Sequence, residues 1–158
     1  MAEGPVYLTT FIEGVLVHGS SMPFLLLVPS AHSPHKGLLM PPQVPWSPGY
    51  LPPALLQALI DTTWKIPFRF HDPSRLPVVF DERTSRLPTP WLLRLEGLEN
   101  QQRLYLSHLL RTRCPENQLP PPPEGGQWVG EKALAAMDLV PGVRRLCQAA
   151  LTLVKELA

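Results

Sequence analysis

Apolar runs alternate with turn-forming residues along the first fifty positions of the chain. Residues 6–17 are rich in Val, Leu, Ile, Thr and Phe, which predicts a strand; Gly14 inside it indicates a bulge or a division into two strands. Residues 23–29 predict a second strand, and Gly19-Ser20-Ser21 predicts the turn that joins the two as a hairpin. Residues 41–50 contain four prolines, which exclude a helix there.

The clearest helix of the chain is predicted over residues 51–64. Pro52 and Pro53 fall in its first turn, where a missing backbone N–H costs nothing. Apolar residues recur at spacings of three and four, which places them on one stripe of a helix. The stripe is wide, so we expect the helix to be largely buried. Its members are Leu51, Ala54, Leu55, Leu56, Ala58, Leu59, Ile60 and Thr62.

Shorter elements follow the helix. Strands are predicted over residues 68–70, 78–80, 91–95, 103–112 and 127–129. A short helix is predicted over residues 131–137, and Pro141 begins a closing helix. This order of elements predicts an α/β fold, with a mixed sheet carrying helices on its faces. A length of 158 residues suits a single domain over 1–158.

Composition narrows the function classes. The chain is 44% hydrophobic and has a formal net charge of +1, so it can bury a core and lacks the basic excess of a nucleic-acid binder. No apolar run reaches the length of a membrane span. Two cysteines without metal-type spacing indicate reduced thiols and a cytoplasmic location. Ten arginines against four lysines, and only two asparagines, are typical of a GC-rich bacterial genome.

Familiar phosphate-binding and metal-binding motifs are absent from the sequence. His32 and His35 stand three residues apart in a proline-bearing loop, but no further ligands follow nearby. We therefore expect two solvent-facing loop histidines and no metal site there. Among the acidic residues near loops, Glu96 ends a predicted strand and is the best candidate for chemistry; the alternative is a solvated carboxylate.

One known family shares the order of these segments. A hairpin precedes Gly37-Leu38-Leu39-Met40-Pro41-Pro42, a loop and the buried helix, and residues 103–110 form a later strand. Trp128-Val129 then leads into a short helix and a long one. Over nearly the whole chain this layout resembles the Nudix (MutT-like) hydrolases. The resemblance implies an α/β/α sandwich with a mixed central sheet and helices on both faces.

The catalytic box of that family is degraded here. The box reads G-x5-E-x7-R-E-U-x-E-E-x-G-U, and laid without gaps on residues 43–65 it matches only at Leu59. Asp61 is a conservative replacement of a glutamate, whereas Gln57 and Ala58 stand where the family has Arg-Glu, and Thr62 replaces the next glutamate. In the family these glutamates hold Mg²⁺ or Mn²⁺, which one carboxylate holds poorly. The replaced positions indicate a former metal face that is now packed or covers a different ligand.

The resemblance and the lost box together favour a non-catalytic binding or regulatory module, for a nucleotide-like ligand or a protein partner, forming a homodimer. It would need no cofactor and would bind neither nucleic acid nor membrane. The candidate ligand-binding residues are Trp46, Tyr50, Gln57, Arg69, Arg83 and Arg86. Aromatic rings stack on bases and arginines pair with phosphates, although packing of Trp64 in the core and of Trp46 on proline is the favoured alternative for these two rings. The alternative is a divergent Mg²⁺- or Mn²⁺-dependent hydrolase of a nucleoside diphosphate-linked substrate, with Asp61 and Glu96 as catalytic residues.

Overall fold

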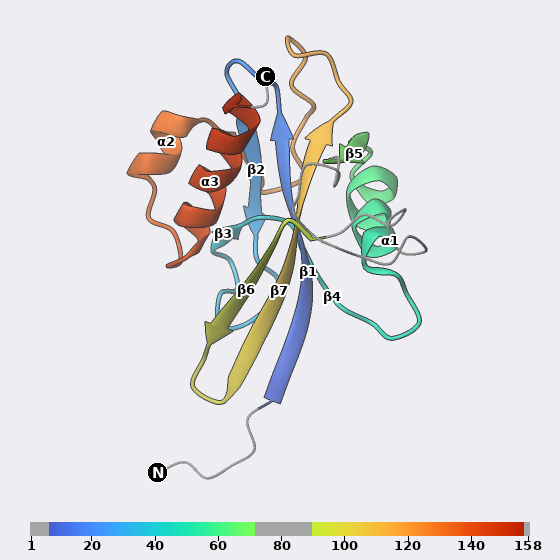
Figure 1. Cartoon of the computed structure of the whole chain (residues 1–158), viewed down its shortest axis with the longest axis vertical. Coiled ribbons are helices and arrows are strands. Elements are labelled where there is room, and N and C mark those ends of the chain that lie inside the picture. The colour runs from blue at the N-terminus through green and yellow to red at the C-terminus, as the bar shows by residue number, and fades with distance from the viewer. Residues whose placement is uncertain (1–6, 72–89, 157–158) are drawn as a thin grey trace.

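The computed structural model describes residues 7–71 and 90–156, which form a mixed sheet of eight strands between two groups of helices (Figure 1). Two long strands form the centre of the sheet, β1 (Tyr7–His18) and β7 (Gln101–Thr112). They run parallel, with a register from Tyr7 beside Gln101 to Val17 beside Arg111. Because side chains alternate along a strand, each long strand presents one row of side chains to each face of the sheet.

Shorter strands extend this central pair on both sides. β2 and β4 both pair antiparallel with β1, at its end and near its middle, while β5 and β6 pair antiparallel with β7. β3 and β8 pair with β2. Their bounds are β2 Phe24–Pro29, β3 Leu39–Met40, β4 Gln43–Pro45, β5 Phe68–Phe70, β6 Leu92–Gly97 and β8 Gln127–Val129.

Helices bury a separate core on each face of the sheet. α2 (Glu131–Ala136) and α3 (Val143–Glu156) pack on the face that carries Val15 and Val17 of β1. α1 (Pro52–Leu56) and the π-helix η1 (Gln57–Thr63) pack on the opposite face, against Ile12 and Leu16. Both faces are therefore covered, and the predicted α/β sandwich is confirmed. In Figure 1 the lower parts of β1, β6 and β7 extend beyond all of these helices.

Most predicted elements lie where the sequence places them. The predicted hairpin is confirmed, because β1 and β2 pair with Val17 beside Leu25. β1 is a single strand through Gly14 rather than two. The predicted helix over 51–64 is present, but its second half is η1 instead of α-helix. The strand prediction over 78–80 lies outside the described residues.

Two strands, the two-residue β3 and β4, escaped the sequence analysis. β4 lies in the proline-rich stretch, where only extended loop was expected. It pairs with β1 alone, and Pro45 is its last residue. Proline is tolerated in such a place because an edge strand leaves backbone N–H groups unused.

Among residues 7–71 and 90–156, no helix is long and apolar enough to cross a membrane.

Candidate functional site

The helix formed by α1 and η1 packs closely on the sheet at Gly14 of β1. A Cβ atom at this position would lie 2.8 Å from Leu110 Cδ1 and 3.3 Å from Leu56 Cδ2. Leu56 and Ile60 are fully buried at this contact, so the opposite side of the helix faces solvent. That exposed side carries Gln57, Ala58, Asp61 and Thr62. Of the two alternatives for the former metal face, packing is therefore wrong for Ala58 and Thr62. The prediction that the helix is largely buried is also wrong, because only Leu56 and Ile60 of its stripe are buried.

A small cavity lies beside this helix, where β1 changes its pairing partner from β4 to β2. Its volume is about 150 Å³. Leu59 and Trp64 line it from the helix, and His32 and Gln43 line it from the segments after β2. Ligand pockets for drug-sized molecules usually measure roughly 300–1,000 Å³. The cavity is therefore too small for a whole nucleotide.

A buried carboxylate lies on the other face of the sheet. Glu13 is fully buried and accepts three hydrogen bonds, from Gln43 Nε2 at 2.7 Å, Arg94 Nη2 at 2.8 Å and Ser107 Oγ at 2.6 Å. The bond from Arg94 is also an ion pair. Such a charge is tolerated inside a protein because it is paired and its oxygens are satisfied. Glu13 is thus a structural anchor that joins β1, β4, β6 and β7.

A second polar cluster adjoins it on β6. Glu96 Oε2 is hydrogen-bonded to His35 Nε2 at 3.0 Å, and Glu96 Oε1 accepts a hydrogen bond from the Tyr105 hydroxyl at 2.9 Å. Only 15% of the Glu96 side chain is exposed. The reading of Glu96 as a solvated carboxylate is therefore wrong. His35 is not solvent-facing as expected, because the loop after β2 folds back over the sheet and delivers it to Glu96.

Aromatic rings and guanidinium groups fill the space between these clusters. The Arg94 guanidinium carbon lies 3.9 Å from the Tyr105 ring centroid, and that of Arg103 lies 4.9 Å from the Phe11 centroid. His32 is half-buried, with its ring centroid 5.0 Å from that of Phe11, so it too is not the solvent-facing histidine expected. These contacts bury ionisable groups in a low-dielectric layer.

This burial shifts the pKa of two of the ionisable groups. Burial raises the pKa of Tyr105, with Arg103 opposing the rise and Glu96 supporting it. Burial also lowers the pKa of His32, and the Arg103 charge lowers it further. Both directions favour the uncharged form of the side chain.

No family model matches the sequence, and none of the curated proteins matches it either. Solved structures do match. A Nudix family hydrolase from Clostridium perfringens superposes with a TM-score of 0.66 at 14% identity, over 92% of this chain and 97% of that one. The Nudix domain of Shewanella oneidensis NrtR, complexed with ADP-ribose, gives a TM-score of 0.55 at 12% identity, over 97% and 91%. NrtR complexed with a 27mer DNA gives 0.53 at 13%, over 89% and 59%.

These superpositions settle the architecture. The chain has the Nudix fold. Its helix of residues 52–63 is the element on which the sequence resemblance placed the degraded box. The Nudix fold thus agrees with the mixed sheet and the helices on both of its faces.

The divalent metal that Nudix hydrolases use does not fit this helix. Within residues 7–71 the only acidic residues are Glu13 and Asp61, and Glu13 is already bound on the opposite face of the sheet. Among the described residues, no group of three or more His, Cys, Asp or Glu side chains is placed to hold a metal ion. Mg²⁺ prefers near-octahedral oxygen ligation, which one aspartate does not supply.

The two candidate catalytic residues lie apart. Glu96 stands beside Arg103 on the face that α3 covers, because β6 and β7 pair in that register. Asp61 lies on the exposed side of η1, which packs on the opposite face. The Nudix fold here therefore does not bring them into one relocated metal site.

The candidate ligand-binding residues are open to solvent where they are described. Trp46 is 45% and Tyr50 62% exposed, and Gln57 and Arg69 are also exposed. None of these four lines the cavity beside the helix, whereas the half-buried Trp64 does. Arg83 and Arg86 lie outside the described residues.

Sequence reasoning missed the residues that the structure brings together, Glu13, Arg94 and Arg103. A signal was present for Glu13, because a lone carboxylate interrupts the apolar run from Phe11 to Val17. A charge at an inward strand position needs a buried partner. The partner itself depends on the parallel register of β1 and β7, which no local pattern specifies.

Proposed function

We propose that this chain is a non-catalytic binding or regulatory module of the Nudix fold, with a nucleotide-like ligand or a partner protein as its target. The observation that carries the proposal is the exposed side of the helix of residues 52–63, where Asp61 is the one carboxylate. Metal-assisted cleavage of a pyrophosphate needs several such groups to hold the ion. The outer side of this helix is exposed to solvent and carries only one acidic residue. Such a surface is available for binding a ligand or a partner.

The comparison with NrtR supports a nucleotide-like ligand. The Nudix domain of that protein was solved with ADP-ribose, so this fold accommodates a nucleoside diphosphate derivative. Trp46 and Tyr50 offer exposed rings for a base, and Arg69 offers a guanidinium for a phosphate. Gln57, Arg83 and Arg86 complete the proposed ligand-binding set. Among the described residues, Arg69 has no ion-pair partner within 4.0 Å that competes with a ligand.

Binding to DNA is not part of the proposal. NrtR was also solved with a 27mer DNA, but a net charge of +1 gives this chain little counterion-release energy with a phosphate backbone. We propose that the chain acts as a cytoplasmic homodimer without a cofactor. Light scattering in solution measures the oligomeric state, and a monomer would contradict that part of the proposal.

Calorimetry and a turnover assay test the main proposal. ADP-ribose and nucleoside triphosphates are titrated into the protein with a chelator present, and then incubated with Mg²⁺ or Mn²⁺. We expect binding without metal and no hydrolysis with it. Asp61→Ala is the diagnostic variant, and Asp138→Ala, an exposed aspartate outside the helix, is its control. Metal-dependent turnover that Asp61→Ala abolishes and Asp138→Ala preserves would overturn the proposal.

A further inference from the structure

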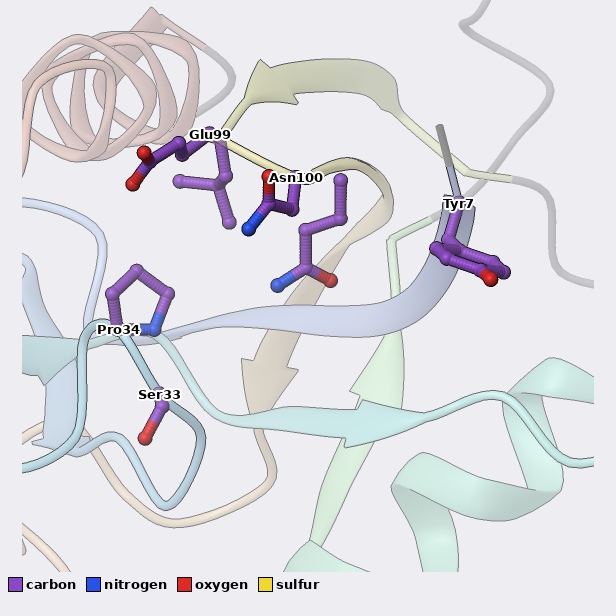
Figure 2. Close-up of a pocket in the computed structure, with 7 residues that line it drawn as sticks. Tyr7, Ser33, Pro34, Glu99 and Asn100 are labelled. Carbon is purple, nitrogen blue, oxygen red and sulfur yellow. The ribbon is translucent and has the colours of Figure 1, made fainter. Parts of the chain in front are cut away.

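A larger cavity lies at the tip of the sheet, where β1 begins and β6 turns into β7. Its volume is about 530 Å³, within the range of ligand pockets. Figure 2 shows Ser33 and Pro34 on one side of it, Asn100 opposite them, and the Tyr7 ring to the side. Gln101 also lines it. This tip lies away from the helix of residues 52–63 (Figure 1).

A buried guanidinium lies behind the inner wall of this tip cavity. Arg103 is only 4% exposed and follows Gln101 by two residues on β7, so both side chains point to the same face of the sheet. Arg103 Nη2 donates a hydrogen bond to the backbone carbonyl of Ser33, which lines the cavity. Its Nε and Nη1 are buried without a hydrogen bond of regular geometry, and Arg103 also interacts with the hydroxyl of Tyr105.

The neighbouring carboxylates, Glu96 and Glu13, are bound to side chains other than Arg103. Glu96 stands beside Arg103 in the strand register but is bound to His35 and Tyr105. Glu13 is bound to Arg94. In residues 7–71 and 90–156, no carboxylate lies within 4.0 Å of the Arg103 nitrogens. A buried charge is costly unless it is paired, so this guanidinium holds a neutral carbonyl where an anion would bind better.

We propose that the tip cavity binds a small ligand carrying one carboxylate or phosphate group, whose oxygens replace the Ser33 carbonyl on Arg103. The Arg103 fork suits two oxygens of one oxyanion. The Tyr7 ring and the amides of Asn100 and Gln101 contact the rest of the ligand. Glu99 stands exposed at the rim, so a single negative charge is better accepted than a polyphosphate.

The loop of residues 30–37 covers this site. The Nε and Nη1 atoms of Arg103 are inaccessible behind Ser33, so entry of the oxyanion displaces that part of the loop. The hydrogen bond between His35 and Glu96 holds the far side of the loop in place. The ligand exchanges one hydrogen bond to a carbonyl for charge-assisted bonds to an anion, which are stronger. The site is independent of the proposed function, because it uses neither Asp61 nor the exposed side of the helix.

Titrations with inorganic phosphate, acetate and AMP, followed by calorimetry and by amide NMR of residues 30–37, test the proposal. We expect saturable binding with shifts in the loop, and the tightest of the three probes identifies the carboxylate, the phosphate or the nucleotide as the recognised group. Arg103→Gln is expected to weaken binding by about tenfold or more, since hydrogen bonds to charged groups contribute about 1.5–3 kcal/mol. Arg145→Gln, an exposed arginine on α3, is expected to bind as the unmodified protein does.

A second variant covers the case in which Arg103→Gln does not fold. Gln101→Glu keeps the side-chain shape and the hydrogen bond from Thr9 Oγ1, and it places a carboxylate in the cavity near Arg103. We expect this variant to fold and to lose binding of all three probes. Absence of binding to the unmodified protein, or binding that Gln101→Glu leaves unchanged, would overturn the proposal. ADP-ribose binding that persists in Gln101→Glu would leave the proposed function intact in either case.

Discussion

At the scale of single residues, the buried pair of Glu13 and Arg94 is the most consequential contact. Removing one partner of a buried ion pair leaves the other uncompensated, which costs about 3–5 kcal/mol. We therefore expect Arg94→Met to lower the free energy of unfolding by about that amount in urea titrations. Arg145→Met, on an exposed arginine, is expected to change it by less than about 0.5 kcal/mol.

A double-mutant cycle separates the pair from its surroundings. Glu13→Gln combined with Arg94→Met is expected to cost less than the sum of the two single changes, because each single variant already breaks the same interaction. Additive costs would show that the 2.8 Å contact contributes nothing to stability.

Sequence reasoning performed unevenly at this scale. It placed Asp61 and Gln57 on the helix, and the structure shows both exposed there. It did not foresee the burial of Arg103, because an arginine on a strand is normally expected at the surface. Its burial follows from the loop of residues 30–37 lying over the sheet, which is a tertiary event. The same loop explains why His32 and His35 are not solvent-facing.

At the scale of elements, Gly14 controls how closely the helix of residues 52–63 approaches the sheet. A methyl group there would meet the buried Leu110 side chain at 2.8 Å, and overpacking of this kind typically costs about 1–3 kcal/mol. We expect Gly14→Ala to lower the melting temperature measurably. Gly97→Ala, in β6, is the matched control, because nothing lies within 4 Å of its added carbon. Equal effects of the two substitutions would contradict this account.

The β1–β2 hairpin turn depends on a carboxylate from a distant segment. Glu116 Oε1 accepts hydrogen bonds from the backbone N–H groups of Ser20 and Ser21, both at 3.0 Å, and from the Ser21 hydroxyl. These bonds favour the ionised form and lower the pKa of Glu116 from 4.5 to about 2. The stabilisation is therefore present above pH 4.5 and is lost as the pH falls toward about 2.

Urea titrations across that pH window test this arrangement. Glu116→Gln is expected to remove the part of the stability that changes between pH 4.5 and about 2. Glu124→Gln, on an exposed glutamate nearby in the chain, is expected to preserve it. Identical pH profiles for Glu116→Gln and the unmodified protein would rule out this role of the carboxylate.

The sequence predicted most helices and strands because the spacing of their apolar residues was clear. It did not predict that the helix changes to η1 at Gln57. The hydrogen bonds of a π-helix join residues five positions apart, and they depend on packing and on how the chain leaves the helix. Here the Trp64 N–H bonds to the Leu59 carbonyl at 3.1 Å, the Thr63 hydroxyl bonds to the Ala58 carbonyl at 3.0 Å, and Lys65 adopts a positive φ of 58°.

At the scale of the whole molecule, the lack of a fitting metal site among residues 7–71 and 90–156 has a thermodynamic consequence. A ligand that binds the folded state raises its stability in proportion to the logarithm of its concentration. We expect the melting temperature to be the same with Mg²⁺, with Mn²⁺ and with a chelator. A rise that saturates with Mg²⁺ and disappears in Asp61→Ala would contradict the lost box.

The overall architecture was predictable because the order of strands and helices permits few packings. The pairing of β1 with β7 was not, since a parallel neighbour leaves no local trace in either strand. That pairing assembles the polar layer of Glu13, Arg94 and Arg103. Of these three residues, Arg103 is the one on which the proposed site at the tip cavity depends.

The parallel contact of β1 with β7 also dictates when the protein becomes complete during synthesis. Glu13 and Ser107, which are hydrogen-bonded, stand 94 positions apart. Most of the chain must leave the ribosome before β1 can pair with β7. Until then the apolar side chains of β1 stay exposed. Pairing between segments so far apart in the sequence slows folding and prolongs the exposure of apolar, aggregation-prone strands. Nascent chains stalled before β7 should consequently be chaperone clients and protease substrates.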